Sequence, residues 1–193
     1  MFKFCSAPWK QVQIHQDGTV QPCLCGGWHT AGTAGNMLTQ SMAEIMQDES
    51  VKRLKQGVLD QSFSVCHDRC PYKWKPEMVE QLPDFVNDLT PLPAEILLAI
   101  DMNCNLKCSM CRPGSVFAKK IDPTAQAILD KLVSSYRHTK TPTVLQMDGA
   151  GDVFASEAWK QFLWRDDMPE CFRFHIITNG NLVIKNKDLM LRH

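Results

Sequence analysis

The stretch ILLAIDMNCNLKCSMC, residues 96–111, joins an apolar run to three cysteines. The nearly continuous apolar run at 96–102 is typical of a strand that is buried on both faces. Cys104, Cys108 and Cys111 follow it at the spacing C-x3-C-x2-C, with no histidine beside them. The sequence therefore predicts a buried strand whose end carries a group of thiols on one loop.

Three thiols on one loop are candidate metal ligands. Cysteine thiolate binds iron and zinc strongly, and a short loop lowers the entropy cost of gathering the ligands. A structural zinc site normally closes with four ligands, typically as two pairs that are widely separated in sequence. A 4Fe–4S cluster normally takes four thiolates, so three thiolates leave one iron open for chemistry.

The residues after the cysteine loop alternate between helix and strand patterns. Asp122-Pro123 predicts a helix start, by the rule that places a capping residue before a proline. This order of strand, helix, strand, helix, strand predicts right-handed βαβ units and a parallel sheet. The loops that follow the strands then share the carboxyl rim of that sheet. The expected elements are helices at 123–137 and 156–164, and strands at 143–148 and 172–178.

This combination of loops resembles the radical S-adenosylmethionine (SAM) superfamily. The C-x3-C-x2-C loop has Met110 before its last cysteine, and IITNG at 176–180 matches sequence that is common after the third strand of that family. The resemblance implies a 4Fe–4S cluster whose open iron is chelated by SAM. Reductive cleavage of SAM then yields a 5′-deoxyadenosyl radical, which abstracts hydrogen from a substrate. The implied ligands are Cys104, Cys108 and Cys111.

The same resemblance implies a SAM-binding turn after the second strand. The segment MDGAGDVFAS, residues 147–156, stands where the family has a Gly-Gly-Glu-Pro motif. Ala150, Gly151 and Asp152 then replace Gly, Gly and Glu, and Val153 replaces the proline. A turn of small residues suffices to present backbone oxygens to the ammonium group of SAM. Asn179 is expected to face SAM or its neighbourhood.

Residues 1–72 carry five cysteines and a different pattern. VQIHQDGTVQP, residues 12–22, predicts a hairpin that turns at Asp17-Gly18. Ser41 and Glu44 form a capping box, which predicts one amphipathic helix that ends near Gly57. The prolines of the segment 73–95 favour an irregular connector with at most one short helix.

This first part is similar to the auxiliary-cluster modules called SPASM or twitch domains. The resemblance rests on FCSAPW at the start, IHQDGTVQPC after it, and a closing pair of cysteines. It implies a second 4Fe–4S cluster, for which four thiolates suffice. Cys25 could replace Cys23, and a four-cysteine zinc knot stays open as the alternative. The implied ligands are Cys5, Cys23, Cys66 and Cys70.

Composition excludes several other classes of function. The 21 basic and 21 acidic residues give a net charge of zero, so neither nucleic acid nor a membrane surface is an expected partner. No apolar run approaches the roughly 20 residues that cross a bilayer, and the start lacks the apolar region of a signal peptide. We therefore expect a cytoplasmic protein, in which nine cysteines indicate metal or redox chemistry.

Together these patterns predict an α/β protein of two units. Residues 1–72 form a small cysteine-rich α+β domain for the auxiliary cluster, residues 73–95 a proline-rich linker, and residues 96–193 a radical SAM core. The family core is a barrel of six βα units, and this sequence supplies three strands, so we expect a partial (β/α)6 barrel.

The predicted function is SAM cleavage and hydrogen abstraction from a peptide, protein, sugar or other small molecule. An external electron donor such as flavodoxin or ferredoxin would reduce the cluster. The alternative is a non-catalytic iron–sulfur or zinc protein, or an electron-transfer protein, derived from a truncated core.

Overall fold

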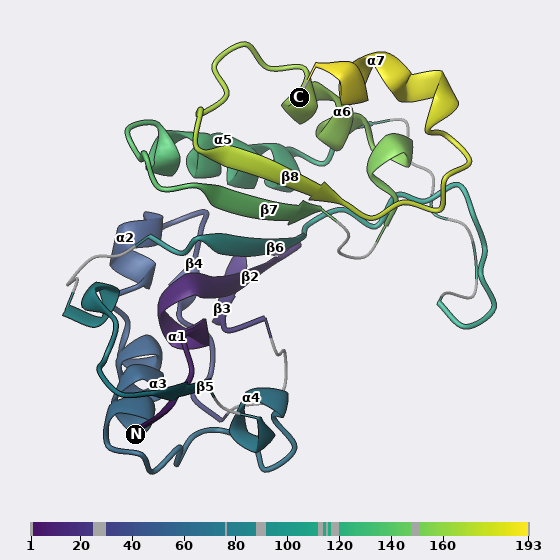
Figure 1. Cartoon of the computed structure of the whole chain (residues 1–193). Coiled ribbons are helices and arrows are strands. Elements are labelled where there is room, and N and C mark those ends of the chain that lie inside the picture. Colours follow the sequence, from purple (N-terminus) through teal and green to yellow (C-terminus); the bar gives the residue numbers. More distant parts are fainter. Residues whose placement is uncertain are drawn as a thin grey trace.

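The computed structural model of the chain is a mixed α/β structure around a six-stranded sheet (Figure 1). The strand order is β4-β3-β2-β6-β7-β8, and β2, β6, β7 and β8 are parallel to one another. These strands are β2 (Gln11–His15), β3 (Thr19–Pro22), β4 (Gly35–Asn36), β6 (Glu95–Ala99), β7 (Thr143–Met147) and β8 (Phe172–Ile176). The structure describes residues 2–24, 30–75, 77–87, 92–111, 114, 116, 120–147 and 151–192.

The predicted hairpin and the predicted parallel strands lie in the same sheet. Strand β2 pairs with β3 in an antiparallel hairpin, and Gly18 takes a φ of 81° at the turn. The other edge of β2 pairs in parallel with β6, with Gln11 opposite Glu95 and His15 opposite Ala99. Both strands alternate buried and half-buried residues, so together they present one apolar face. The expectation that the strand at 96–102 is buried on both faces is therefore wrong, because the residues on its other face are only half-buried. The two predicted units are thus joined through one sheet, and their boundaries at 72 and 96 stay a prediction.

The βαβ order downstream is confirmed. Helix α5 (Pro123–Tyr136) begins where Asp122 caps it, because the Asp122 side chain accepts a hydrogen bond from the Thr124 nitrogen at 2.8 Å. Helix α6 follows β7, and its first turn is capped by Ser156. Both helices pack on one face of the sheet (Figure 1). The remaining elements of this part are η2 (Val153–Ala155), α6 (Glu157–Leu163), η3 (Ile184–Asn186) and α7 (Lys187–Leu191).

The prediction of one helix over 41–57 is wrong. The capping box of Ser41 and Glu44 forms, but it starts the short helix α2 (Met42–Ile45). A second helix, α3 (Glu49–Leu59), begins after Asp48, whose side chain accepts a hydrogen bond from the Ser50 nitrogen at 2.8 Å. The helical pattern is interrupted because the Asp48 side chain caps a new helix start.

The proline-rich connector is more ordered than the sequence indicates. It contains a strand, β5, which pairs antiparallel with the first strand of the chain, β1, from Phe2 opposite Val79 to Phe4 opposite Glu77. This pairing joins segments that are far apart in sequence, so local proline content could not reveal it. The elements are β1 (Phe2–Phe4), α1 (Ala7–Lys10), α4 (Pro71–Trp74), β5 (Glu77–Val79) and η1 (Asp84–Asn87).

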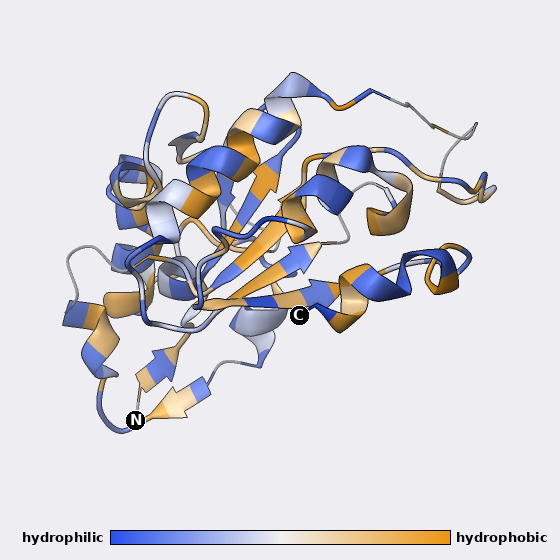
Figure 2. Cartoon of the chain, turned by 90° about the horizontal axis from the view of Figure 1, so that it is seen from above, coloured by the Kyte–Doolittle hydropathy of each residue, from blue (hydrophilic) through white to orange (hydrophobic). Residues whose placement is uncertain are grey.

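One large hydrophobic core runs through both predicted units. It includes Val12 and Ile14 of the hairpin together with Ile96, Leu98 and the buried face of α5. Figure 2 shows hydrophobic residues along the central strands and alternating hydrophobic and hydrophilic residues along the surrounding helices. In the described part of the chain, no helix has the length and apolar character needed to cross a membrane.

Candidate metal centres

The cysteine loop leaves the sheet at the carboxyl end of β6. Cys104 is buried, and its nitrogen donates a hydrogen bond to the Val116 oxygen at 2.7 Å in an isolated β-bridge. Cys108 and Cys111 are exposed, and the Cys111 nitrogen donates to the Cys108 oxygen at 3.0 Å. The loop therefore fixes one thiol at its base and presents two to solvent.

Gly151 brings the turn after β7 against the base of this loop. A Cβ atom added to Gly151 would lie 2.4 Å from the Asn103 oxygen and 2.7 Å from the Asp101 oxygen. The next residue continues the contact, because the Asp152 nitrogen donates to the Asn103 oxygen at 2.7 Å. Only glycine allows this approach of two backbones. The expected meeting of these two loops at the carboxyl rim is thus observed, whereas Ala150 lies outside the described residues.

Asp152 joins the third loop to the other two. The residue is 2% exposed, and its carboxylate accepts hydrogen bonds from the Phe154 nitrogen at 3.0 Å and the Thr178 hydroxyl at 2.7 Å. It also accepts from the Asn179 nitrogen at 2.8 Å. The Asn179 side chain in turn reaches the Cys104 sulfur, with 3.8 Å between nitrogen and sulfur. The carboxylate thus ties the loop after β8 to the loop after β7.

The rim also contains residues to which the sequence-based prediction gave no role, namely Asp101, Asn103 and Ser156. Asp101 is buried, and one carboxylate oxygen accepts from both the backbone nitrogen and the side-chain amide of Asn103, each at 2.7 Å. The other oxygen accepts from the Ser156 hydroxyl at 2.5 Å. An aspartate two residues before an asparagine at a strand end is a signal for such a turn. The bond to Ser156 joins residues 55 positions apart, so no local sequence pattern could predict it.

The four predicted ligands of the auxiliary cluster lie in one region. Cys23 is buried in a small apolar cluster, against which Cys5 and Cys66 also pack. Burial raises the pKa of Cys5, and the neighbouring Cys70 and Cys66 add to the rise, so that this pKa is about 11. Burial and the neighbouring Cys70 also raise the pKa of Cys66. Trp9, 2% exposed, belongs to an adjoining cluster that Cys5 and Cys66 contact as well.

Cys23 occupies an unusual backbone conformation. Its φ is 64°, in the left-handed region that side chains other than glycine rarely adopt. Its nitrogen donates to the Gln11 oxygen at 2.8 Å, which continues the hairpin pairing by one residue. Backbone strain of this kind is often found at functional sites. Cys25, the predicted substitute for Cys23, lies outside the described residues.

The two groups of cysteines lie at opposite ends of the sheet. Cys23 bonds to Gln11 at the amino end of β2, and Gln11 lies opposite Glu95 at the amino end of β6. The three-cysteine loop follows the carboxyl end of β6. At a rise of about 3.3 Å per residue, the five residues of β6 separate the two ends by about 16 Å.

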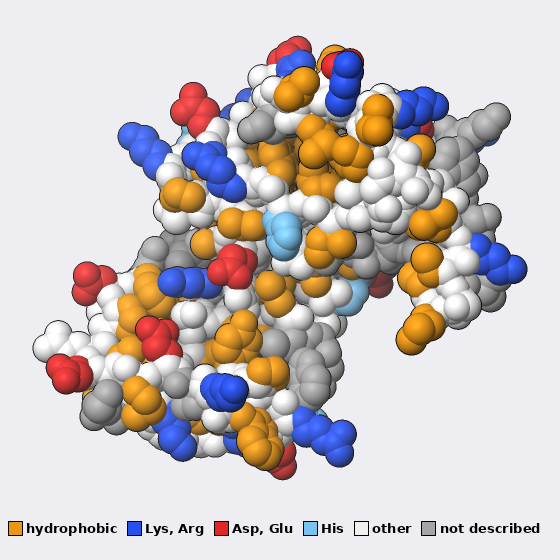
Figure 3. Space-filling model, turned by 45° about the vertical axis from the view of Figure 1, so that its right-hand side comes forward, with side chains coloured by type: hydrophobic (Ala, Val, Ile, Leu, Met, Phe, Trp, Pro, Cys, Tyr) orange, Lys and Arg blue, Asp and Glu red, His pale blue; other side chains and the backbone are white. Residues whose placement is uncertain are grey.

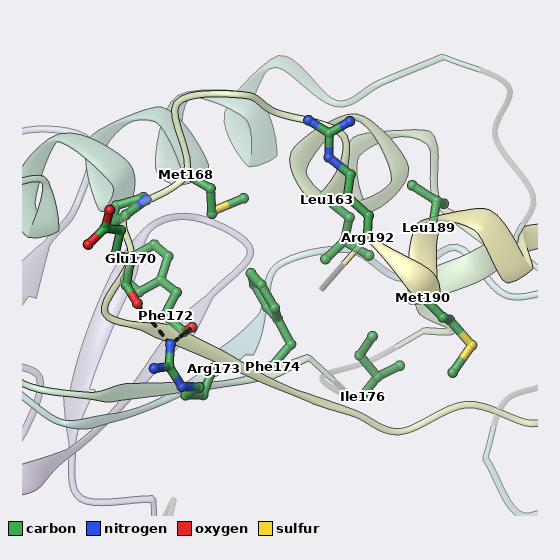
Figure 4. Close-up of a pocket in the computed structure, with 11 residues that line it drawn as sticks. Leu163, Met168, Glu170, Phe172, Arg173, Phe174, Ile176, Leu189, Met190 and Arg192 are labelled. Carbon is green, nitrogen blue, oxygen red and sulfur yellow. Dashed lines mark hydrogen bonds between the residues drawn. The ribbon is translucent and has the colours of Figure 1, made fainter.

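A groove of about 710 Å³ lies beside β8, and none of the predicted ligand cysteines lines it. Figure 3 shows hydrophobic side chains gathered around a hollow in the upper half of the molecule. In Figure 4, Phe174 and Ile176 of β8 face this groove, and Arg173 bonds to the oxygens of Glu170 and Phe172. Leu163, Leu189 and Met190 are among the other apolar residues that line it.

Comparison with known proteins finds a family match for the first part of the chain. Residues 5–71 match the family model of SPASM, an iron–sulfur cluster-binding domain. Domains of this family are found in radical SAM enzymes. No curated protein and no solved structure matches the chain. The match therefore indicates iron–sulfur binding by the region that contains Cys5, Cys23, Cys66 and Cys70.

The predicted donors at both sites are of the chemical type that iron–sulfur clusters take. Among the residues that the structure describes, no group of three or more His, Cys, Asp or Glu side chains is arranged to hold one metal ion. Each thiolate of a 4Fe–4S cluster binds a different iron, so its ligand sulfurs lie farther apart than the ligands of a single ion. The predicted donors are all thiols, which soft iron–sulfur sites prefer.

Proposed function

We propose that this chain carries out radical SAM chemistry on a partial radical SAM barrel formed by β6, β7 and β8. The observation that supports this most strongly is the close packing of the Gly151 turn on the base of the cysteine loop at the carboxyl rim. The SPASM match adds support, because such domains are found in radical SAM enzymes. The proposed ligands of the SAM-binding cluster are Cys104, Cys108 and Cys111, and those of the auxiliary cluster are Cys5, Cys23, Cys66 and Cys70.

When bound, the cluster and SAM supply one-electron cleavage of SAM and hydrogen abstraction from the substrate. The residues of this chain position them. Cys104 fixes the buried base of the loop, while the exposed Cys108 and Cys111 leave the outer side open for SAM to approach. Ala150, Gly151, Asp152 and Asn179 form the proposed SAM-binding set.

We propose that the auxiliary cluster transfers electrons and does not bind the reacting atom of the substrate. Hydrogen abstraction needs the reacting atoms within about 3–3.5 Å of each other. The length of β6 alone would place a substrate atom bound at the amino end of β2 about 16 Å from the three-cysteine loop.

We propose a flavodoxin or ferredoxin as the electron donor, a peptide, protein, sugar or other small molecule as the substrate, and a cytoplasmic location.

A non-catalytic electron-transfer protein is the second candidate. The SPASM match concerns iron–sulfur binding, and an electron-transfer protein would satisfy it equally well. The two candidates differ in what the three-cysteine loop does with SAM. In the enzyme SAM is consumed, whereas in the electron-transfer protein it stays intact.

The test is anaerobic reconstitution with iron and sulfide, followed by dithionite and SAM. We expect 5′-deoxyadenosine, measured by liquid chromatography, from the wild-type protein. Cys108→Ser is the matched control, because Cys108 is exposed and its loss should leave the fold intact. This variant should keep the auxiliary cluster and form no 5′-deoxyadenosine. Intact SAM beside two loaded clusters would favour the electron-transfer protein, and zinc without iron would rule out both candidates.

A further inference from the structure

The side-chain amide of Asn179 contacts the base of the cysteine loop at two points. Its Nδ2 atom donates to the Cys104 sulfur at 3.8 Å and to the Asn105 Oδ1 atom at 2.9 Å. Cys104 and Asn179 are 75 residues apart in sequence and come from the loops after β6 and β8. The contact therefore links a proposed cluster ligand to a different strand of the sheet.

The orientation of this amide is set by its surroundings. The Asn181 nitrogen donates to the Asn179 Oδ1 atom at 3.1 Å, which leaves the NH2 group to face Cys104 and Asn105. The backbone is held as well, because the buried Asp152 carboxylate accepts from the Asn179 nitrogen at 2.8 Å. A flipped amide would place its NH2 group against the Asn181 donor and its oxygen against the Asn105 oxygen.

We propose that Asn179 is a positioning residue that holds Cys104 and, when a cluster is bound there, raises the reduction potential of that cluster. A hydrogen bond to a cluster thiolate stabilises the reduced form most, because that form carries more negative charge. Asp152 acts through Asn179 by holding its backbone in place. The second half of the inference rests on the proposed function, since it requires a cluster at Cys104, Cys108 and Cys111.

Asn179→Asp and Asn181→Asp make a matched pair of variants. Each variant replaces an amide by a carboxylate of the same shape in the same loop. Asn181 contacts Asn179 through the backbone nitrogen of Asn181, so Asn181→Asp leaves that hydrogen bond in place. Potentiometric titration followed by electron paramagnetic resonance gives the potential, and subtracting the signal of a C104A/C108A/C111A variant isolates this cluster. We expect Asn179→Asp to lower the equilibrium constant for reduction about three- to tenfold, where tenfold corresponds to about 59 mV for one electron. The reduction potential of this cluster in Asn181→Asp should stay close to the wild-type value.

A second measurement uses the metal-free protein. Hydrogen exchange of the peptide that contains residues 103–107 should become severalfold faster in Asn179→Ala, because the loop loses its tie to β8, and stay unchanged in Asn181→Ala. The proposal would be overturned if hydrogen exchange in Asn179→Ala were as slow as in the wild type. It would also be overturned if Asn181→Asp shifted the reduction potential as much as Asn179→Asp does. If wild type loads no cluster at this loop, the proposed function fails, while hydrogen exchange still decides whether Asn179 holds Cys104. If the cluster loads and Asn179→Asp keeps the wild-type potential, the potential-raising role of Asn179 is overturned and the proposed function stands.

Discussion

Gly151 is the residue at which the loops after β6 and β7 come closest. An added Cβ would meet backbone atoms of Asp101 and Asn103, which cannot move aside as a flexible side chain would. The position therefore requires glycine because no space is left for a side chain. Any larger residue must shift the base of the cysteine loop.

Gly151→Ala should destabilise the protein and weaken its three-cysteine site. Overpacking against backbone costs about 1–3 kcal/mol, which urea unfolding measures. Iron bound at the three-cysteine loop should fall as well, because Asn103 directly precedes Cys104. Gly114→Ala is the control, since a Cβ at Gly114 meets no atom of the described residues within 4 Å. Equal stability and iron content in the two variants would contradict the packing described here.

At the scale of the element, helix α5 is tied to the segment that leads into β6. The Tyr136 hydroxyl, fully buried at the end of α5, donates to the Pro93 oxygen at 2.8 Å. Pro93 is itself buried. The bond therefore fixes the entry of the central strand against the helix that follows it.

Tyr136→Phe should lower the free energy of unfolding by about 1–3 kcal/mol, because it leaves the buried Pro93 oxygen without its donor. Thermal or urea unfolding measures the change. The chain provides a matched control in Tyr72, its other tyrosine, which is 40% exposed. Tyr72→Phe should change stability by less than about 0.5 kcal/mol. A Tyr136→Phe protein as stable as Tyr72→Phe would contradict the assigned role.

Most elements could be predicted from local patterns, and the exceptions depend on distant contacts. The hairpin at Asp17-Gly18 and the capped start of α5 follow from turn and capping chemistry within a few residues. The pairing of β1 with β5 joins residues more than 70 positions apart, so no short window contains it. The break between α2 and α3 has a local signal, the capping aspartate Asp48, but the capping box at Ser41 and the glycine at 57 favour a single helix between them.

For the molecule as a whole, the same distinction applies to the candidate sites. Cysteine spacing alone predicted two groups of thiols, and the alternation of strands predicted that the loops after β6 and β7 meet. The parallel pairing of β2 with β6 could not be predicted, because it needs the tertiary arrangement of two segments about 80 residues apart. That pairing places the two groups at opposite ends of one sheet. The bonds from Asp152 to Thr178 and Asn179 likewise depend on the folded chain.

The most direct test of two separate cluster sites is the iron content of the reconstituted protein and of two variants. Wild type should bind about eight irons per chain, and both C104A/C108A/C111A and C5A/C23A/C66A/C70A should bind about four. Circular dichroism identifies any variant that has lost its fold. Wild-type protein that binds zinc and no iron, or a C104A/C108A/C111A variant that still binds eight irons, would contradict the account.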